Sequence, residues 1–434
     1  MHHLGRWGVK VAGLVLSVAT VAACASRTPA QGAPTKAPAV RPGMTVLLED
    51  SLQVIAGRRI ALITNHTTVD ASGTHLIDVL QKDPRIKRAN VTLVRLLSPE
   101  HGIRGDVDRE NLPDQLDERS GLMVHSLYTN GTVPPPDSLL RDLDALVFDL
   151  QDIGTRTWTY VGVMVYGMRA AARAGIPYIV LDRPNPITGR MEAPLLDSAL
   201  SNPEDPTPTR RGLAFALYPA PLRHGMTNGE MARWFAAELG IPVQLTVVPM
   251  QGWRRTMWWD ETGLPWVVPS PAMATVTSAL VYPALVPLEG TNVSVGRGTK
   301  APFQRFGAPW MDAPRLATML NELGFVGVRF EAERFTPRES PDRKFNDREI
   351  PGVKIVVTDR DRAPMGRVGA AVLWSLKKVH ADSLRVTERT VDQRFGSMAA
   401  RQALFAGTDP DEVIDAMQPA VAAFQRKVRP YLLY

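Results

Sequence analysis

The sequence has almost no cysteine: Cys24 is the single one among 434 residues, so no disulfide bond can form within the chain. Its eight histidines show none of the H-E-x-x-H or Cys/His spacings typical of metal sites, and we expect neither a metal nor another cofactor. Lysine and arginine are dispersed rather than clustered with aromatic residues, although the formal net charge is +6, and we expect no nucleic-acid partner. The hydrophobic core alone must therefore stabilise the folded part of the chain.

Motifs of nucleotide-binding and acyl-transfer enzymes are also missing. The first predicted strand, 59–64, is followed by Asn-His-Thr-Thr rather than by a glycine-rich turn. The Gly-Arg-Gly-Thr-Lys segment at 296–300 has the wrong order and spacing for a Walker motif. An S-x-x-K pattern at 375–378 has no partner motif, and no nucleophile elbow is present, which disfavours an esterase or a transpeptidase.

The N-terminal segment has the pattern of an export signal. Arg6 and Lys10 precede an uncharged apolar run at 11–23, which is shorter than the roughly 20 apolar residues that span a bilayer. The run ends in Val-Ala-Ala before Cys24, which resembles the lipobox of bacterial lipoproteins. This resemblance implies a signal peptide over 1–24, lipidation of Cys24, and an exported, membrane-anchored protein that faces the periplasm or the cell exterior. A plain signal peptide with a chance cysteine, or a short anchor, is the alternative.

The remaining chain predicts a tether and two domains. Residues 25–43 are rich in alanine and proline and predict a flexible tether. Residues 44–270 alternate short apolar strands with amphipathic helices, which is typical of an α/β domain with a mostly parallel, Rossmann-like sheet covered on both faces. A proline-rich stretch ends near residue 270, and residues 271–434 predict a smaller α+β domain. The predicted strands are 59–64, 91–97, 145–150, 178–181, 243–248 and 354–358, and the predicted helices are 74–81, 161–174, 229–239, 313–323, 368–378 and a last one that begins after Asp411.

Polar residues follow each of the first four predicted strands, at the point where the strand ends. Carboxyl ends of parallel strands meet at one edge of a sheet, where open α/β sheets bind ligands. Glu100 is the leading candidate, because Pro99 and Gly102 hold it in a turn, and burial of a carboxyl group favours its use as a general acid. Loop capping is an equally good explanation of Asp149 and Asp182. The strand-end residues are Asn65 after the first strand, Glu100 and His101 after the second, Asp149, Asp152 and Arg156 after the third, and Asp182, Arg183 and Asn185 after the fourth.

Four tryptophans crowd one segment beside the predicted domain boundary. They are Trp253, Trp258, Trp259 and Trp266. Aromatic faces near asparagine and arginine side chains suit a sugar ligand. For any single one of these tryptophans, packing at a domain interface is the better explanation.

Several short motifs occur in an order that resembles one known family. They are Ser-Pro-Glu-His-Gly at 98–102, Asp-Leu-Gln-Asp-Ile-Gly at 149–154 with Arg156 and Tyr160, Asp-Arg-Pro-Asn-Pro at 182–186, Arg-His-Gly-Met-Thr at 223–227, Glu-Gly-Thr-Asn at 289–292, Gly-Arg-Gly-Thr at 296–299 and the terminal Tyr-Leu-Leu-Tyr at 431–434. The chain is similar, from about residue 46 to the C-terminus, to the bacterial exo-β-N-acetylmuramidases of the NamZ type. The resemblance implies hydrolysis of the β-1,4 bond that releases a non-reducing terminal N-acetylmuramic acid from peptidoglycan fragments. It also implies an active-site cleft between the Rossmann-like N-terminal domain and the smaller C-terminal domain.

The resemblance also implies roles for catalytic residues. The family's catalytic glutamate falls on Glu100, which we expect to protonate the leaving glycosidic oxygen. A catalytic tyrosine of the family is assigned to Tyr160, in a segment where Trp158 replaces one of the aromatic residues that relatives often carry. A second group must act at the anomeric carbon, by activating water, as a nucleophile, or by orienting the substrate's acetamido group. The candidates for this second group are Asp149, Asp152 and Asp182.

The other motif residues are expected to bind the sugar. The lactyl carboxylate of muramic acid needs a cation, and the planar fork of arginine suits a carboxylate. The candidates for this contact are Arg156, Arg183, Arg223 and Arg297. Hydroxyl and acetamido groups would be bound by Asn65, Asn185, Asn292 and His224, and His101 and Glu289 complete the predicted substrate-binding set. The alternative is a lipoprotein that holds muropeptides without cleaving them, which would share the anchor, the cleft and the arginines but would not need Glu100.

Overall fold

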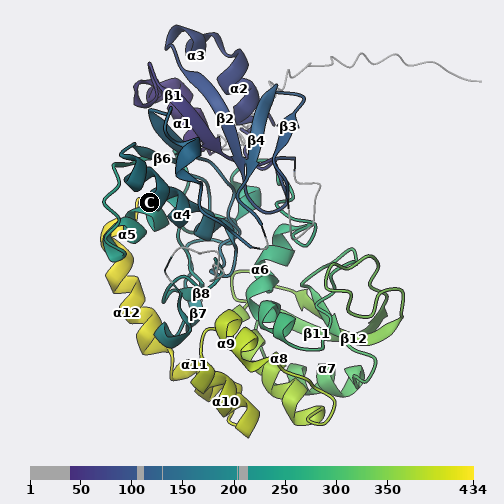
Figure 1. Cartoon of the computed structure of the whole chain (residues 1–434). Helices are drawn as coiled ribbons and strands as arrows, with labels where there is room; N and C mark the ends of the chain where they lie inside the picture. The colour runs from purple at the N-terminus through teal and green to yellow at the C-terminus, as the bar shows by residue number, and fades with distance from the viewer. Residues whose placement is uncertain (1–39, 105–111, 130, 203, 205–213) are drawn as a thin grey trace, which may run out of the picture. The chain divides into compact units, whose positions relative to one another are not determined.

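Seven strands form the main sheet of the computed structural model, which describes residues 40–104, 112–129, 131–202, 204 and 214–434. The predictions on Cys24, on the signal peptide and on the tether up to residue 39 lie outside these residues. The order in the sheet is β3-β4-β2-β1-β5-β6-β9, and every neighbouring pair is parallel except β3 with β4 (Figure 1). The strands are β1 (Arg59–Ile63), β2 (Thr92–Ser98), β3 (Gln115–Asp117), β4 (Leu122–Ser126), β5 (Ala145–Phe148), β6 (Tyr178–Leu181) and β9 (Leu245–Val248).

The first strand, β1, lies near the middle of this sheet, and the later strands are added outward on both sides. β1 lies between β2 and β5, so the chain first moves through β2 to β4 and then returns to β5, β6 and β9. This is the strand order of a doubly wound α/β sheet, in which the ligand crevice lies at the carboxyl ends of the strands where the winding reverses. The mostly parallel sheet predicted from the sequence is therefore confirmed.

Strand residues alternate between two hydrophobic cores, one on each face of the sheet. In β1, Ile60 and Leu62 pack into one core, whereas Ala61 and Ile63 pack into the other. Neighbouring side chains of a strand point to opposite faces, so a strand buried on both faces has a continuous apolar sequence. The first face is covered by α1 (Gly43–Asp50), α2 (Leu76–Lys82) and α3 (Pro84–Arg88), and the second by α4 (Tyr160–Ala174) and α5 (Asn228–Glu238).

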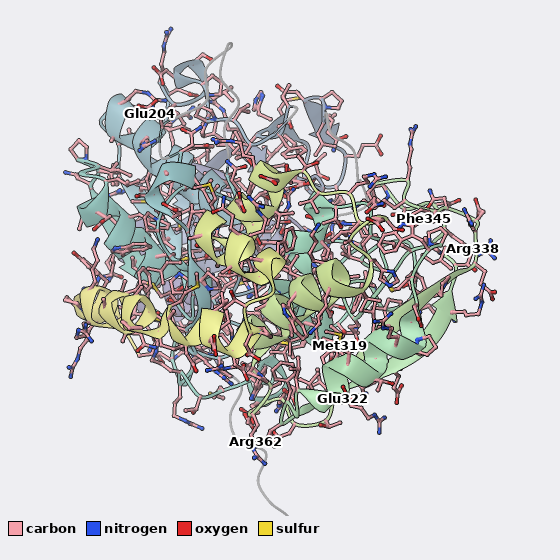
Figure 2. All side chains as sticks on the ribbon, turned by 90° about the horizontal axis from the view of Figure 1, so that it is seen from below. Glu204, Met319, Glu322, Arg338, Phe345 and Arg362 are labelled. Atoms are coloured by element: carbon pink, nitrogen blue, oxygen red, sulfur yellow. The ribbon has the colours of Figure 1, made fainter. Side chains whose placement is uncertain are left out.

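The C-terminal half contains a small antiparallel sheet packed by helices, and its last helix returns to α5. The sheet has the order β10-β12-β11, and α7 packs on it through Leu316 and Leu320. Met319 and Glu322 of α7 are labelled in Figure 2. Phe424 of α12 makes an edge-to-face contact with Trp234 of α5. The remaining strands are β7 (Glu192–Leu195), β8 (Pro221–Arg223), β10 (Arg305–Gly307), β11 (Val328–Phe335) and β12 (Ile350–Val357). The remaining helices are α6 (Val276–Leu285), α7 (Ala313–Glu322), α8 (Met365–Val379), α9 (Glu388–Phe395), α10 (Met398–Ala406), α11 (Pro410–Asp415) and α12 (Gln418–Val428).

Most predicted elements are confirmed to within a few residues, and β6 has the predicted bounds. One expectation is wrong. Residues 40–43 do not belong to the tether, because Val40 is 1% exposed, its N–H donates to the Thr262 carbonyl (2.8 Å), and α1 begins at Gly43. The last α-helix, α12, begins after Asp411 as predicted, and the shorter α11 precedes it.

Three of the four clustered tryptophans are buried inside the protein. Trp253, Trp258 and Trp259 are each at most 5% exposed, so they do not offer a ring face to a sugar. Within the described ranges, no helix is long and apolar enough to cross a membrane. The same ranges contain no group of three or more His, Cys, Asp or Glu residues that could hold a metal ion.

Candidate active site

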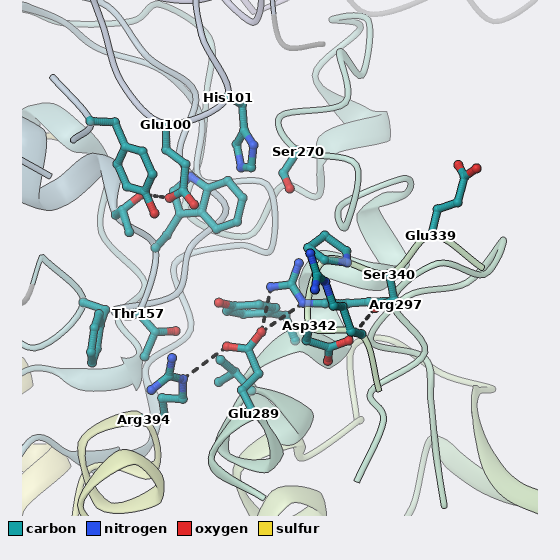
Figure 3. A pocket seen from close by; sticks show the side chains of 18 of the residues that line it. Glu100, His101, Thr157, Ser270, Glu289, Arg297, Glu339, Ser340, Asp342 and Arg394 are labelled. Atoms are coloured by element: carbon teal, nitrogen blue, oxygen red, sulfur yellow. Dashed lines mark hydrogen bonds and ion pairs between the residues drawn. The ribbon is translucent and has the colours of Figure 1, made fainter. Parts of the chain in front are cut away.

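A cavity of about 1120 Å³ opens at the carboxyl end of β2, and its walls come from both halves of the described chain (Figure 3). The turns after β2 and β4 and residues 157–159, which directly precede α4, form one wall. The other wall is formed by α6, by the segment that follows α6, and by the loop between β11 and β12. The lining residues are Glu100, His101, Tyr128, Thr157, Trp158, Thr159, Phe215, Ser270, Tyr282, Val286, Glu289, Arg297, Glu339, Ser340, Pro341, Asp342, Arg343, Asn346 and Arg394.

Glu100 lies at this cavity because the chain turns sharply at the end of β2. The strand ends at Ser98, and His101 and Gly102 both adopt left-handed backbone conformations, with φ of 72° and 75°. The hydroxyl of Thr159, which directly precedes α4, donates a hydrogen bond to Oε2 of Glu100 (2.9 Å). A partly buried carboxyl group therefore faces the cavity from a position fixed by β2 and by α4.

Tyr160 is close to Glu100, but it does not line the cavity. Its fully buried hydroxyl accepts a hydrogen bond from Nδ2 of Asn65 (2.8 Å) and donates one to the Pro269 carbonyl (3.2 Å). Burial, together with the charge of Glu100, raises the pKa of Tyr160 well above its usual range. The amide oxygen of Asn65 is also engaged, by the hydroxyl of Thr67 (2.6 Å). Asn65 therefore holds Tyr160 behind the cavity, and Asn65 itself does not face the cavity. The predicted contact of Asn65 with the substrate is corrected.

The aspartates predicted as the second catalytic group are buried outside the cavity. Asp149 forms a two-pronged ion pair with Arg183, in which Nη2 and Oδ2 are 2.9 Å apart. Asp182 accepts hydrogen bonds from the hydroxyls of Thr227 (2.7 Å) and Tyr434 (2.8 Å), and burial raises its pKa to about 7. The first pair joins the ends of β5 and β6, and the bonds of Asp182 join the end of β6 to the start of α5 and to the C-terminus, so neither carboxylate is directed at the cavity.

Asp152 is also engaged inside the protein. It accepts a hydrogen bond from the Gly154 N–H (2.6 Å) and pairs with Nε2 of His224 (3.2 Å). Nδ1 of His224 accepts from the Met226 N–H (3.1 Å), and Asn185 donates to the Met226 carbonyl (3.0 Å). These hydrogen bonds hold loops together behind the cavity. The prediction that Asp152, His224 and Asn185 line the site is corrected.

Three of the arginines predicted to bind a carboxylate are bonded to the protein itself. Arg183 is paired as described above, and Arg223 pairs with Glu192 (2.9 Å). Arg156 donates to two backbone carbonyls of α9 (3.0 Å each), and burial lowers its pKa to about 9. Asn292 likewise donates to the backbone between α8 and α9 (2.9 Å). These predictions are corrected as well, because the groups hold chain segments together.

A charged cluster forms the wall of the cavity that faces away from β2. Oε1 of Glu289 accepts from Arg297 (Nη2, 2.6 Å), and its Oε2 accepts from Nε of Arg394 (3.1 Å) (Figure 3). Burial opposes the ionisation of Glu289, but the two guanidinium groups hold its pKa below the usual range. Of the predicted site residues, the structure thus brings Glu100, His101, Glu289 and Arg297 together around one cavity.

Several lining residues were not predicted from the sequence. Trp158 lies two residues before Tyr160, and its ring packs edge-to-face on Tyr282 (6.2 Å between centroids). Arg394 and the residues of the loop between β11 and β12 belong to none of the motifs. Nothing in their local sequence distinguishes them, because they reach the cavity only through the tertiary fold.

Comparisons with known proteins agree along nearly the whole chain. The family model described as "Exo-beta-N-acetylmuramidase NamZ, N-terminal" matches residues 60–277, and its C-terminal counterpart matches residues 280–434. The chain is 38% identical, over 418 residues that make up 96% of each chain, to the peptidoglycan beta-N-acetylmuramidase NamZ of Bacillus subtilis (strain 168). Two crystal structures of DUF1343 family proteins from Bacteroides fragilis NCTC 9343 are similar in fold. One has a TM-score of 0.79 at 34% identity and covers 91% of this chain and 99% of its own. The other has a TM-score of 0.71 at 26% identity and covers 92% and 99%.

Proposed function

The chain belongs to the NamZ family of exo-β-N-acetylmuramidases, and from this membership we propose that it releases a non-reducing terminal N-acetylmuramic acid from peptidoglycan fragments. The observation that carries the proposal is the position of Glu100, at the end of β2 and facing a cavity of about 1120 Å³. Cavities of a few hundred Å³ or more accommodate small ligands such as a sugar. The reaction would serve peptidoglycan turnover.

In the proposed reaction Glu100 is the general acid. Its proton passes to the glycosidic oxygen as the bond to the anomeric carbon breaks, and water supplies the new hydroxyl of the released sugar. Thr159 keeps the carboxyl group oriented. The second role falls to Asp342, a carboxylate on the other wall (Figure 3), or to the acetamido group of the substrate. Anomer-resolved NMR of the first product tests these routes: water activated by Asp342 inverts the anomeric centre, whereas a nucleophilic carboxylate or an acetamido intermediate retains it.

Replacement of the acid tests the proposal directly. We expect Glu100→Gln to lower kcat on a muramic-acid-terminated disaccharide at least ~100-fold, the usual size of general acid catalysis. Glu322→Gln, on an exposed position of α7 (Figure 2), is the matched control and should retain the wild-type rate. Near-normal turnover by the Glu100 variant would remove this residue from the mechanism. Saturable binding by the wild type without any product would instead favour the non-catalytic muropeptide-binding lipoprotein.

We also propose that the protein is exported and held on a membrane by a lipid on Cys24. The support is the sequence: the apolar run at 11–23 and the Val-Ala-Ala-Cys motif that ends it. Metabolic labelling with a fatty acid should mark the wild type, and Cys24→Ser should lose the label and leave the membrane fraction. An unlabelled wild type, or a Cys24 variant that stays on the membrane, would contradict the anchor.

A further inference from the structure

An Ω-loop over residues 337–347, between β11 and β12, forms part of the cavity wall. Its ends meet, because the backbone N–H of Asp347 donates to the Pro337 carbonyl (2.8 Å). Side-chain-bearing residues rarely adopt left-handed backbone conformations, and they persist there only where the surroundings impose them. Four residues of this loop do so, with φ between 50° and 61°: Glu339, Arg343, Phe345 and Asp347.

Contacts within the loop and to its neighbour impose this shape. The Ser340 N–H donates to Oδ1 of Asn346 (3.0 Å), whose Nδ2 donates back to the Ser340 carbonyl (3.2 Å). Nζ of Lys344 donates to the Val293 carbonyl (3.1 Å), in the segment that follows α6. A Cβ at Gly298 would lie 2.3 Å from the carbonyl oxygen of the residue before Glu339, so loop and segment are in close backbone contact. The two segments therefore form one fixed wall (Figure 3).

Arg343 is the cation that this wall leaves available for a ligand. It lines the cavity, and among the residues that the structure describes its guanidinium forms neither a hydrogen bond nor an ion pair. Oδ1 of the adjacent Asp342 accepts hydrogen bonds from within the loop, and Asp342 does not pair with Arg343. The other arginines of the wall, Arg297 and Arg394, share the carboxylate of Glu289. The guanidinium of Arg343 has no carboxylate partner, and the loop holds it in place. Its paired N–H donors can therefore bind an anion.

We propose that Arg343 binds the lactyl carboxylate of the terminal N-acetylmuramic acid and makes the enzyme selective for sugars that carry it in free form. This inference rests on the proposed function. N-acetylmuramic acid differs from N-acetylglucosamine by the lactyl ether, and the carboxylate is the one charge that this ether adds. The pairing is lost when the sugar lacks the ether, and it is lost when an amide replaces the carboxylate. Selectivity for the free acid therefore lies in one side chain of the C-terminal half, far along the chain from Glu100.

The test compares three aryl β-glycosides: N-acetylmuramic acid, its lactyl N-methylamide, and N-acetylmuramyl-L-alanine. Arg343→Asn removes the cation with a residue that tolerates the left-handed backbone of this position. We expect kcat/KM on the free acid to fall about 10- to 100-fold, the usual size of a hydrogen-bonded charge contact, and to stay unchanged on the N-methylamide. Arg343→Lys should fall between the two. Arg348→Asn, an exposed arginine beside the loop that does not line the cavity, is the control with the same change of charge.

Other outcomes would contradict either the role of Arg343 or the proposed function. Wild-type kinetics of Arg343→Asn on the free acid would overturn the inference and leave the proposed function intact. An equal loss on acid and amide would show a structural role, and a loss on the alanyl substrate alone would assign Arg343 to a peptide carboxylate. If the wild type cleaves none of the glycosides, the proposed function fails. Calorimetric binding of free N-acetylmuramic acid to wild type and variant then tests Arg343 without turnover, and equal affinities would overturn the inference.

Discussion

The buried Asp182 and the partly buried Glu289 have opposite electrostatic surroundings. Glu289 contacts two guanidinium groups, and these hold its pKa below the usual range although burial opposes ionisation. Asp182 is bound by neutral donors, which include the hydroxyls of Thr227 and Tyr434, and burial raises its pKa to about 7. Hydrogen bonds from neutral groups favour the charged form at Asp182, but there they do not outweigh the loss of hydration.

The raised pKa of Asp182 predicts a pH dependence of stability. Between the unfolded pKa near 4 and the folded value of about 7, the folded state binds more protons, so stability is present at low pH and is lost as the pH rises through 7. Between pH 5 and pH 8 this one group should lower the free energy of unfolding by about 2–3 kcal/mol, an order-of-magnitude figure from the size of the shift.

Urea unfolding at these two pH values measures the effect. Asp182→Asn, which cannot titrate, should show a drop smaller than that of the wild type by this amount. The exposed Asp137→Asn should keep the wild-type drop, which makes it the control for the loss of a carboxylate. An Asp182 variant whose stability falls with pH as steeply as the wild type would contradict the assignment.

At the scale of elements, the strands of the sheet interior could be predicted and its edge could not. β1, β5 and β6 are buried on both faces, so their sequences are continuously apolar. β3 and β4 form a short antiparallel edge where Leu116 and Met123 are 57% and 43% exposed, and the apolar pattern fails there. α6 was also missed, because Pro283 lies inside it and proline usually breaks a helix.

The site elements divide in a similar way. Glu100 could be predicted because a proline and a glycine enclose a carboxylate at a strand end. Asp149 and Arg183 have the same kind of position, but β5 and β6 are neighbours in the sheet and the two side chains neutralise each other. This pairing depends on strand order, which the local sequence does not encode. The Ω-loop has no glycine at its left-handed positions, so its backbone shape could not be predicted from the local sequence either. Its residues Arg338 and Phe345 are labelled in Figure 2.

At the scale of the folded chain, the two halves share one hydrophobic core. The family models meet between residues 277 and 280, within the first turns of α6. The core does not divide there, because one buried cluster extends from Ala61 in β1 to Val428 in α12. Arg156, which follows β5, adds hydrogen bonds to the backbone of α9. Neither half, taken alone, covers its own apolar surface.

We therefore expect the folded part of the chain to unfold in one cooperative transition. Chains longer than about 150 residues often unfold through intermediates, so a single transition is informative. In scanning calorimetry the calorimetric and van't Hoff enthalpies should agree, and tryptophan fluorescence and hydrolytic activity should be lost together. Residues 280–434 produced alone should bind a hydrophobic dye, because the face that packs on β7 and α5 is exposed. Two resolved transitions, or a C-terminal fragment that unfolds cooperatively without binding the dye, would show that the shared core does not couple the halves. The cavity could then lose one wall while the other stays folded.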